Sequence, residues 1–195
     1  MKANTQITDK HVVRFNGQTL HIPQPSYFML HKPVNYVCST DDPQHRSVMN
    51  LISRSDQLEL HIVGRLDLDA TGLLLLTSDG QWSHKVTSPQ KQCAKTYQVH
   101  LDKPISKEAI DQLETGLLLK GESKITHPAQ AEAVNELTIN LTITEGRYHQ
   151  VKRMLAAVGN HVVSLHRTRV GAITLDDTLT LGSYRSLTAD EIASF

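Results

Sequence analysis

Alternating hydrophobic and polar residues predict a series of short β-strands along this chain. The alternation is clearest at residues 95–101 and 136–144, where every second side chain is apolar, as in a strand with one buried face. Largely apolar segments of strand length occupy residues 27–31, 60–63 and 73–77. Near the start, residues 11–22 have the pattern of a hairpin around Asn16-Gly17, a pair that favours a tight turn.

Helical spacing is clearest at residues 149–158. Apolar residues recur there at i, i+3, i+4 and i+7, and Gly159 follows in the position of a C-terminal cap: Val151, Met154, Leu155, Val158. A second helix is predicted at residues 106–114, and a last one begins at Thr188, with Glu191 completing a capping box. Because strands and helices do not alternate regularly, we predict an α+β fold: a mixed, mostly antiparallel sheet flanked by short helices.

Length and composition bound the class of protein. The chain has 195 residues, 39% of them hydrophobic, which is enough for one large domain or two small ones. No segment approaches the run of about 18 apolar residues that spans a membrane, and the first residues lack the apolar stretch of a secretory signal. Cys38 and Cys93 are too far apart in the sequence to indicate a disulfide framework or a metal-site spacing. We therefore expect a cytoplasmic protein with no membrane segment and no metal.

Charge is distributed unevenly although the formal net charge is zero. Residues 147–169 contain no Asp or Glu, yet they hold five Arg or Lys and three His: Arg147, Lys152, Arg153, Arg167, Arg169, His149, His161, His166. A second acid-free stretch, residues 81–101, carries Lys85, Lys91 and Lys95. A neutral chain can thus present one basic face to RNA or DNA, while an ordinary solvated surface is the alternative.

The most informative segment is Gly64-Arg-Leu-Asp-Leu-Asp-Ala-Thr-Gly-Leu-Leu-Leu-Leu-Thr-Ser-Asp-Gly80. It predicts a strand, a short polar loop with Arg65, Asp67, Asp69 and Thr71, and a second, buried strand. Functional residues often lie on loops held between rigid strands, but turn aspartates are also common in plain hairpins. The two aspartates could also be read as a glycosidase pair, although their geometry cannot be assigned from sequence.

This segment resembles the signature of the RsuA family of pseudouridine synthases. Further stretches resemble other elements of that family and follow in the expected order: residues 31–40, 95–97, 145–154 and 165–171. The resemblance runs from about Ser26 to the C-terminus and implies a pseudouridine synthase catalytic domain over residues 26–195. Family members usually begin with an S4-like RNA-binding domain, and residues 1–25 resemble only a remnant of it plus a linker.

The resemblance implies an isomerase that converts a uridine of RNA to pseudouridine without a cofactor. Residues 38–42, 79–84 and 156–162 are most similar to the member that acts on 16S ribosomal RNA. The expected partner is ribosomal RNA or a small-subunit assembly intermediate, and the enzyme is expected to be a monomer by analogy. Two alternatives stay open: a synthase for 23S ribosomal RNA or transfer RNA, and a non-catalytic RNA-binding factor in ribosome assembly.

The family motifs also assign roles to residues. Asp67 is expected to be the nucleophile, since a carboxylate is charged at neutral pH and needs no base. Tyr97 would stack on the extruded uracil, and Lys152 would pair with Asp67; Arg153 is the alternative if the alignment slips by one. The remaining candidates are substrate contacts, each of which could instead be an ordinary surface residue: Arg65, Lys32, Thr71, Arg147, His149, Arg153, Arg167 and Arg169. The histidines lack a zinc-site spacing, so no metal is expected.

Overall fold

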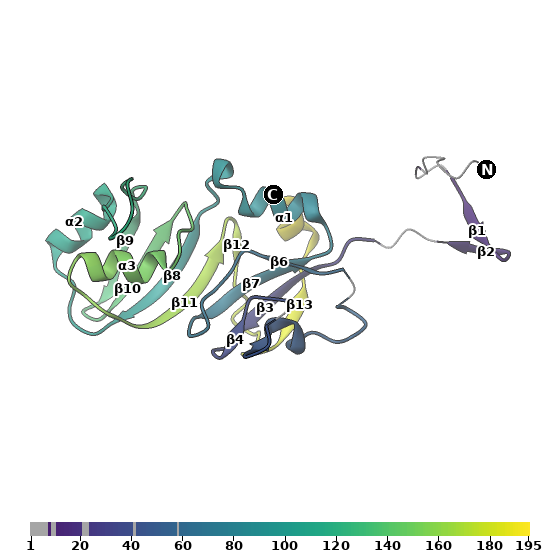
Figure 1. Cartoon of the computed structure of the whole chain (residues 1–195), viewed down its shortest axis with the longest axis horizontal. Helices are drawn as coiled ribbons and strands as arrows, with labels where there is room; N and C mark the ends of the chain where they lie inside the picture. The colour runs from purple at the N-terminus through teal and green to yellow at the C-terminus, as the bar shows by residue number, and fades with distance from the viewer. Residues whose placement is uncertain (1–7, 9–10, 21–23, 41, 58) are drawn as a thin grey trace.

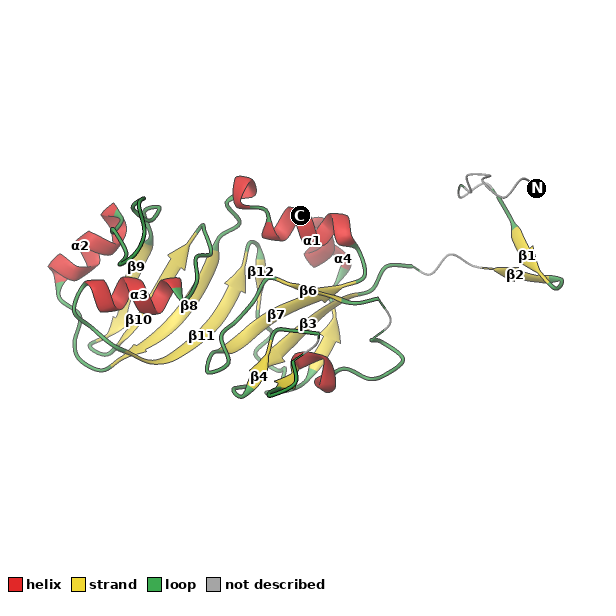
Figure 2. Ribbon diagram, in the orientation of Figure 1, coloured by secondary structure: helices red, strands yellow, loops and turns green. Residues whose placement is uncertain are grey.

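The computed structural model describes residue 8 and residues 11–20, 24–40, 42–57 and 59–195. Its main body is an α+β fold around one mixed sheet, in which nine strands are described. The sheet is mostly antiparallel, so the predicted fold class is confirmed (Figure 2). The strand order is β13 (Tyr184–Ser186), β3 (Tyr27–Lys32), β7 (Thr71–Thr77), β11 (Val162–Val170), β8 (Lys95–Leu101), β10 (Thr138–Ile143) and β9 (Gln130–Asn135), with β6 (His61–Val63) on β7 and β12 (Ile173–Thr174) on β11.

Four α-helices are described, and they lie against this sheet or at its ends (Figure 1). They are α1 (Gly80–Thr87), α2 (Lys107–Thr115), α3 (Gln150–Ala157) and α4 (Ala189–Ala193), with short 3-10 turns at Val48–Leu51 and Pro89–Lys91. Two small two-stranded sheets complete the described structure: β1 (Val13–Phe15) with β2 (Gln18–Leu20), and β4 (Tyr36–Val37) with β5 (Arg46–Ser47). None of the helices in the described ranges is long and apolar enough to cross a membrane.

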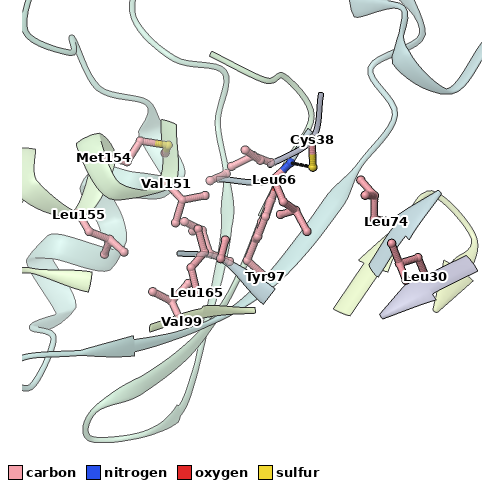
Figure 3. Packing of buried hydrophobic residues seen from close by; sticks show 14 of the residues in the cluster. Leu30, Cys38, Leu66, Leu74, Tyr97, Val99, Val151, Met154, Leu155 and Leu165 are labelled. Carbon is pink, nitrogen blue, oxygen red and sulfur yellow. Dashed lines mark hydrogen bonds between the residues drawn. The ribbon is translucent and has the colours of Figure 1, made fainter. Parts of the chain in front are cut away.

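Strand β7 is buried on both faces, which explains its run of four leucines. Leu74 and Leu76 belong to the larger core cluster, on the side of α2 and α3. Leu73 and Leu75 belong to the second cluster, together with Trp82 of α1. A strand covered on both sides needs apolar residues at consecutive positions rather than at alternate ones. Figure 3 shows part of the larger cluster, where α3 packs over β8 and β11.

Strands β7 and β11 are paired in parallel, and a glycine permits their close approach. His166 lies opposite Thr71, and Arg167 lies opposite Gly72. A Cβ at Gly72 would lie 2.3 Å from the backbone oxygen of Arg167, and the φ angle of Gly72 is +111°. Only glycine satisfies both conditions. This contact brings β11 beside the loop that precedes β7.

Most predicted elements are present. Strand β8 has the predicted bounds, α2 lies within one residue of the predicted range and is capped by Ser106, and α3 ends before Gly159. The Asn16-Gly17 hairpin pairs over Val13–Phe15 and Gln18–Leu20; residues 21–22 of the predicted hairpin lie outside the described residues. Whether residues 1–25 derive from an S4-like domain stays a prediction.

Several elements differ from the expectation, and two of them matter for the site. An Asp-Gly pair is typical of turns, so Asp79-Gly80 is expected to close the strand at residues 73–77. Instead, the Asp79 carboxylate accepts bonds from the backbone nitrogens of Gln81 and Trp82 and so begins α1. Strand β11 was not predicted, because polar residues occupy much of it. It is a strand because β7 and β8 both pair with it.

Candidate active site

The loop between β6 and β7, residues 64–70, is held from inside by one buried lysine. Lys32 is fully buried, and its Nζ donates to the backbone oxygens of Asp67 at 3.0 Å and Ala70 at 2.8 Å. It also donates to Pro33 O at 3.0 Å and lies 3.5 Å from Leu68 O. The ammonium thus draws together carbonyl groups from Pro33 and from the loop, which need donors in the protein interior.

Burial lowers the pKa of Lys32, while the Cys38 thiol and the carboxylates of Asp69 and Asp67 partly oppose that change. The prediction that Lys32 contacts RNA phosphate is wrong, because its charge is enclosed by the loop backbone. It shapes the loop instead.

Additional contacts fix the loop backbone around Asp67. The Asn35 nitrogen donates to Leu68 O at 2.8 Å, and the Ala70 nitrogen donates to Asp67 O at 3.1 Å. The Leu66 nitrogen donates to the Cys38 sulfur at 3.3 Å, the bond drawn in Figure 3. The backbone is therefore anchored on the inside, while the Asp67 side chain keeps 26% of its surface exposed.

Two basic side chains from the start of α3 surround the Asp67 carboxylate. Lys152 Nζ lies 3.2 Å from Asp67 Oδ2, and His149 Nε2 lies 3.5 Å from Asp67 Oδ1. The ion pair expected between Lys152 and Asp67 is thus present. Lys152 makes a shorter contact, 2.6 Å, with Asp69 Oδ1, so one ammonium bridges two carboxylates.

This bridge changes the pKa values of Asp69 and Lys152. The hydrogen bond from Lys152 holds the pKa of Asp69 below its usual value. Burial acts to lower the pKa of Lys152, but the hydrogen bonds to Asp69 and Asp67 outweigh it and raise that pKa. Lys152 therefore stays charged beside Asp67 at neutral pH.

The turn before α3 places these two basic residues. His149 precedes the helix in a left-handed conformation, with a φ angle of 48°. The turn is closed by Gln150, whose Oε1 accepts from the Arg147 nitrogen at 2.8 Å and whose Nε2 donates to Glu145 at 2.8 Å. Val151 is buried in the core below, and Lys152 follows it on the side of the helix that faces the loop.

Asp67 lies in the wall of a cavity of about 650 Å³. The cavity is lined by loop residues 64–68, by Lys95 and Tyr97 of β8, by residues 143–152, by Leu165 and Arg167 of β11, and by Val37, Cys38, Thr87 and Pro89. Tyr97 is only 8% exposed and packs in the same cluster as Leu66, Val151 and Leu165 (Figure 3). A volume of this size and a mixed lining suit a small organic group.

Comparison with known proteins agrees with this arrangement. The sequence profile of the family described as RNA pseudouridylate synthase matches residues 26–157, more than half of the chain. The chain belongs to this family. It is an RNA pseudouridine synthase, and the resemblance found in its sequence is confirmed.

Similar proteins extend over nearly the whole chain. The enzyme is 52% identical to ribosomal small subunit pseudouridine synthase A of Yersinia pestis, over 97% of this chain and 81% of that protein. It is 51% identical to the protein of that name from Escherichia coli strain K12, over 97% of this chain and 82% of that protein. A solved pseudouridylate synthase is 46% identical, with a TM-score of 0.85 over 97% of this chain and 82% of that one. A chain of an archaeal box H/ACA sRNP complex, 21% identical, has a TM-score of 0.54 over 80% of this chain and 51% of its own, and shows the fold alone.

Several predicted substrate contacts of the enzyme are bonded within the protein. Arg147 donates to the carbonyls of Lys124 and Ile125 at 2.7 and 2.6 Å and pairs with Glu145. Arg153 donates to the carbonyls of Lys120 and Tyr148 and pairs with Glu122 at 2.9 Å. Their guanidinium groups tie residues 120–125 to the start of α3.

Arg167 is buried, with 3% of its surface exposed. Its Nε donates to Leu73 O at 2.8 Å and its Nη1 to Arg65 O at 3.1 Å, while Nη2 has no hydrogen-bond partner among the described residues. Strand β11 lies beside Gly72 and carries this side chain inward, where it lines the cavity, so its contact with the substrate stays a prediction. Arg167 joins β11 to β7 and to the loop of Asp67.

The other predicted contacts are placed differently. Arg65 is exposed and lines the cavity, as does His149. Thr71 and Arg169 do not line it: the Thr71 hydroxyl lies 2.7 Å from His166 Nδ1, and Arg169 Nε donates to Gly171 O. Their contribution to RNA binding stays a prediction.

Sequence reasoning missed Tyr148 of the enzyme. It lines the cavity, is 76% exposed and stacks on His149, with 3.8 Å between ring centroids. Tyr148 lies inside residues 145–154, which resemble a family motif, and directly before the candidate His149. That position could have indicated a residue of the site. Its exposure could not be read from the hydrophobic pattern.

Proposed function

We propose that this enzyme converts a specific uridine of 16S ribosomal RNA to pseudouridine, with Asp67 as the nucleophile. One observation carries the proposal: the Asp67 carboxylate lies in the wall of a cavity that Tyr97 also lines, paired with Lys152. The names of the two relatives at 51–52% identity support the small-subunit substrate. The proposal places the enzyme in the cytoplasm, on the RNA or on an assembly intermediate of the small subunit.

The reaction is an isomerisation within one nucleotide. The N1–C1′ bond breaks, the uracil turns, and a C5–C1′ bond forms; C5 loses its proton and N1 gains one, so atoms and electrons balance. Inside a duplex or a folded loop the target base is stacked, and enzymes that act on a base take it out of the stack. The 650 Å³ cavity would receive the extruded uracil.

Four residues of the cavity would then have separate roles in the reaction. Asp67 attacks as a carboxylate and forms a bond to the sugar or the base, which breaks again as the pseudouridine is completed, and Lys152 holds the carboxylate in position. The Tyr97 ring would pack against the uracil, and its hydroxyl would move the C5 proton. Arg65, exposed at the cavity wall, would fill the place of the extruded base, since a planar guanidinium can stack and bind phosphate.

The direct test is tritium release from unmodified 16S RNA labelled at C5 of uridine. Replacing Asp67 by Asn keeps the shape of the side chain and removes the nucleophilic charge, so the rate should fall by at least about 1,000-fold. Asp177→Asn is the matched control, because Asp177 is exposed and does not line the cavity. An Asp67→Asn protein that folds normally and keeps its rate would contradict the assignment.

The substrate is tested separately. The same assay on 23S ribosomal RNA and on transfer RNA should give no release, and a deletion strain should lack pseudouridine in its 16S RNA only. Rescue of small-subunit assembly by Asp67→Asn without pseudouridine would favour the assembly-factor alternative instead.

A further inference from the structure

An exposed aromatic ring at the mouth of the cavity has no part in the chemistry proposed above. Tyr148 has the largest exposed fraction, 76%, among the exposed large hydrophobic residues of the described chain. It nevertheless lines the same cavity as Asp67. A tyrosine offers a broad apolar face and a polar tip, a combination that is favoured at binding surfaces.

The ring of Tyr148 is fixed in place although it is exposed. It stacks on His149 with 3.8 Å between centroids and 21° between planes, and His149 in turn lies 3.5 Å from Asp67. The Tyr148 carbonyl accepts a bond of 3.1 Å from Arg153, which anchors the backbone at this position. One face of the ring is therefore covered by His149, and the other face is open to solvent.

We propose that the open face of Tyr148 is a stacking platform for the nucleobase next to the uridine that enters the cavity; this inference rests on the proposed function. Extrusion of a uridine leaves the adjacent base without its stacking partner. Proteins commonly cover such bases of single-stranded RNA with aromatic side chains. A base on Tyr148 would continue the stack that begins at His149, one ring step further from Asp67.

The distance between the Tyr148 and His149 rings is similar to the distance between stacked nucleobases. The 3.8 Å between Tyr148 and His149 is close to the rise of ~3.4 Å between successive stacked bases. The surroundings favour a base over a phosphate, because the neighbouring guanidinium groups of Arg147 and Arg153 are bonded to carbonyls and carboxylates of the protein. Since every base has a π face, the platform should add affinity and position without selecting one base.

The test uses three synthetic RNAs with one sequence, taken from the 16S segment around the uridine that the enzyme modifies. The first has normal neighbours, the second an abasic site on the 5′ side of the uridine, and the third an abasic site on its 3′ side. Tritium release is measured as kcat/KM for the wild type, Tyr148→Ala and Tyr148→Phe. Leu181→Ala is the control, because Leu181 is 58% exposed and does not line the cavity.

On the normal RNA, Tyr148→Ala should lose roughly 5- to 150-fold in kcat/KM, the range expected when a base-stacking aromatic is removed. Tyr148→Phe and Leu181→Ala should retain the wild-type value. The wild type should lose a similar factor on one of the two abasic RNAs, and Tyr148→Ala should lose nothing further on that RNA. The two changes would then act on a single contact.

Three results would overturn the platform: an unchanged Tyr148→Ala rate, an equal loss in Tyr148→Phe, or a Tyr148→Ala loss that persists in full on both abasic RNAs. Because Tyr148 is largely exposed, the fold should tolerate its truncation, which a melting curve verifies. If the wild type releases no tritium from the normal RNA, the proposed function fails and the platform fails with it. A normal wild-type rate without the abasic dependence refutes the platform alone.

Discussion

Replacing Lys32 by Met should test whether this buried ammonium gives the loop of Asp67 its shape. Methionine has a similar length and volume, so the substitution leaves no large cavity and removes only the ammonium. Three backbone oxygens then lose a donor at 2.8–3.0 Å: Pro33, Asp67 and Ala70. All three accept from one buried side chain, so water does not replace the lost donor freely.

The expected change in the free energy of unfolding of Lys32→Met follows from two opposing contributions. A hydrogen bond from a charged donor contributes about 1.5–3 kcal/mol, and three such bonds are lost. Removing the ammonium also removes its burial cost, which is several kcal/mol and is the cause of the lowered pKa of Lys32. The bonds should outweigh that cost, and we expect the free energy of unfolding to fall by about 2–4 kcal/mol.

The assay combines urea unfolding, followed by circular dichroism, with tritium release at a temperature where the variant is folded. The rate should fall more than the folded fraction does, because the loop that carries Asp67 loses its anchor. Lys85→Met is the control: Lys85 is exposed on α1, so its loss should change stability by less than about 0.5 kcal/mol. If Lys32→Met matches this control in both stability and rate, the ammonium does not organise the loop.

Two other substitutions test the fold around the site. Gly72→Ala should cost about 3 kcal/mol or more in unfolding free energy, because its Cβ would overlap Arg167 O, whereas Gly80→Ala, with open space around its Cβ, should be neutral. For Asp176, the hydroxyl and backbone N–H of Thr178 and then Arg185 lower the pKa to about 2. That stabilisation is present above pH 3.8 and is lost as the pH falls toward 2, so the melting temperature of Asp176→Asn should lie below that of the wild type at pH 6 and approach it at pH 2. A difference that stays constant over this pH range would contradict the assignment.

Local sequence patterns predicted those elements whose structure is determined by their own residues. Strand β8 could be bounded because one of its faces is buried and the other is not, and α3 because an apolar stripe precedes Gly159. Strand β11 could not, since its polar residues become a strand only between β7 and β8. Helix α1 was missed because an Asp-Gly pair is typical of turns and of helix starts alike.

The site likewise has some features set by local sequence and others set by contacts with distant segments. The loop of Asp67 and the positions of Tyr97 and Lys152 followed from motifs of contiguous residues. The inward bonding of Lys32 and Arg167 could not be foreseen, because the carbonyl groups that accept from them come from other segments. A lysine or arginine in a sequence carries no sign of whether the folded chain surrounds it. Charge clustering in a sequence therefore does not distinguish free surface cations from those bonded within the protein.

The inward-facing arginines have a consequence for how the enzyme should respond to ionic strength. A cation that binds phosphate releases counterions from the nucleic acid, and each such contact steepens the loss of affinity with added salt. We expect Arg147 and Arg153 to release none, since their charge is matched by Glu145 and Glu122 within the protein. The salt dependence of RNA binding should therefore come from other exposed cations such as Arg65, and the affinity should decline less steeply than the number of Arg and Lys in residues 147–169 suggests.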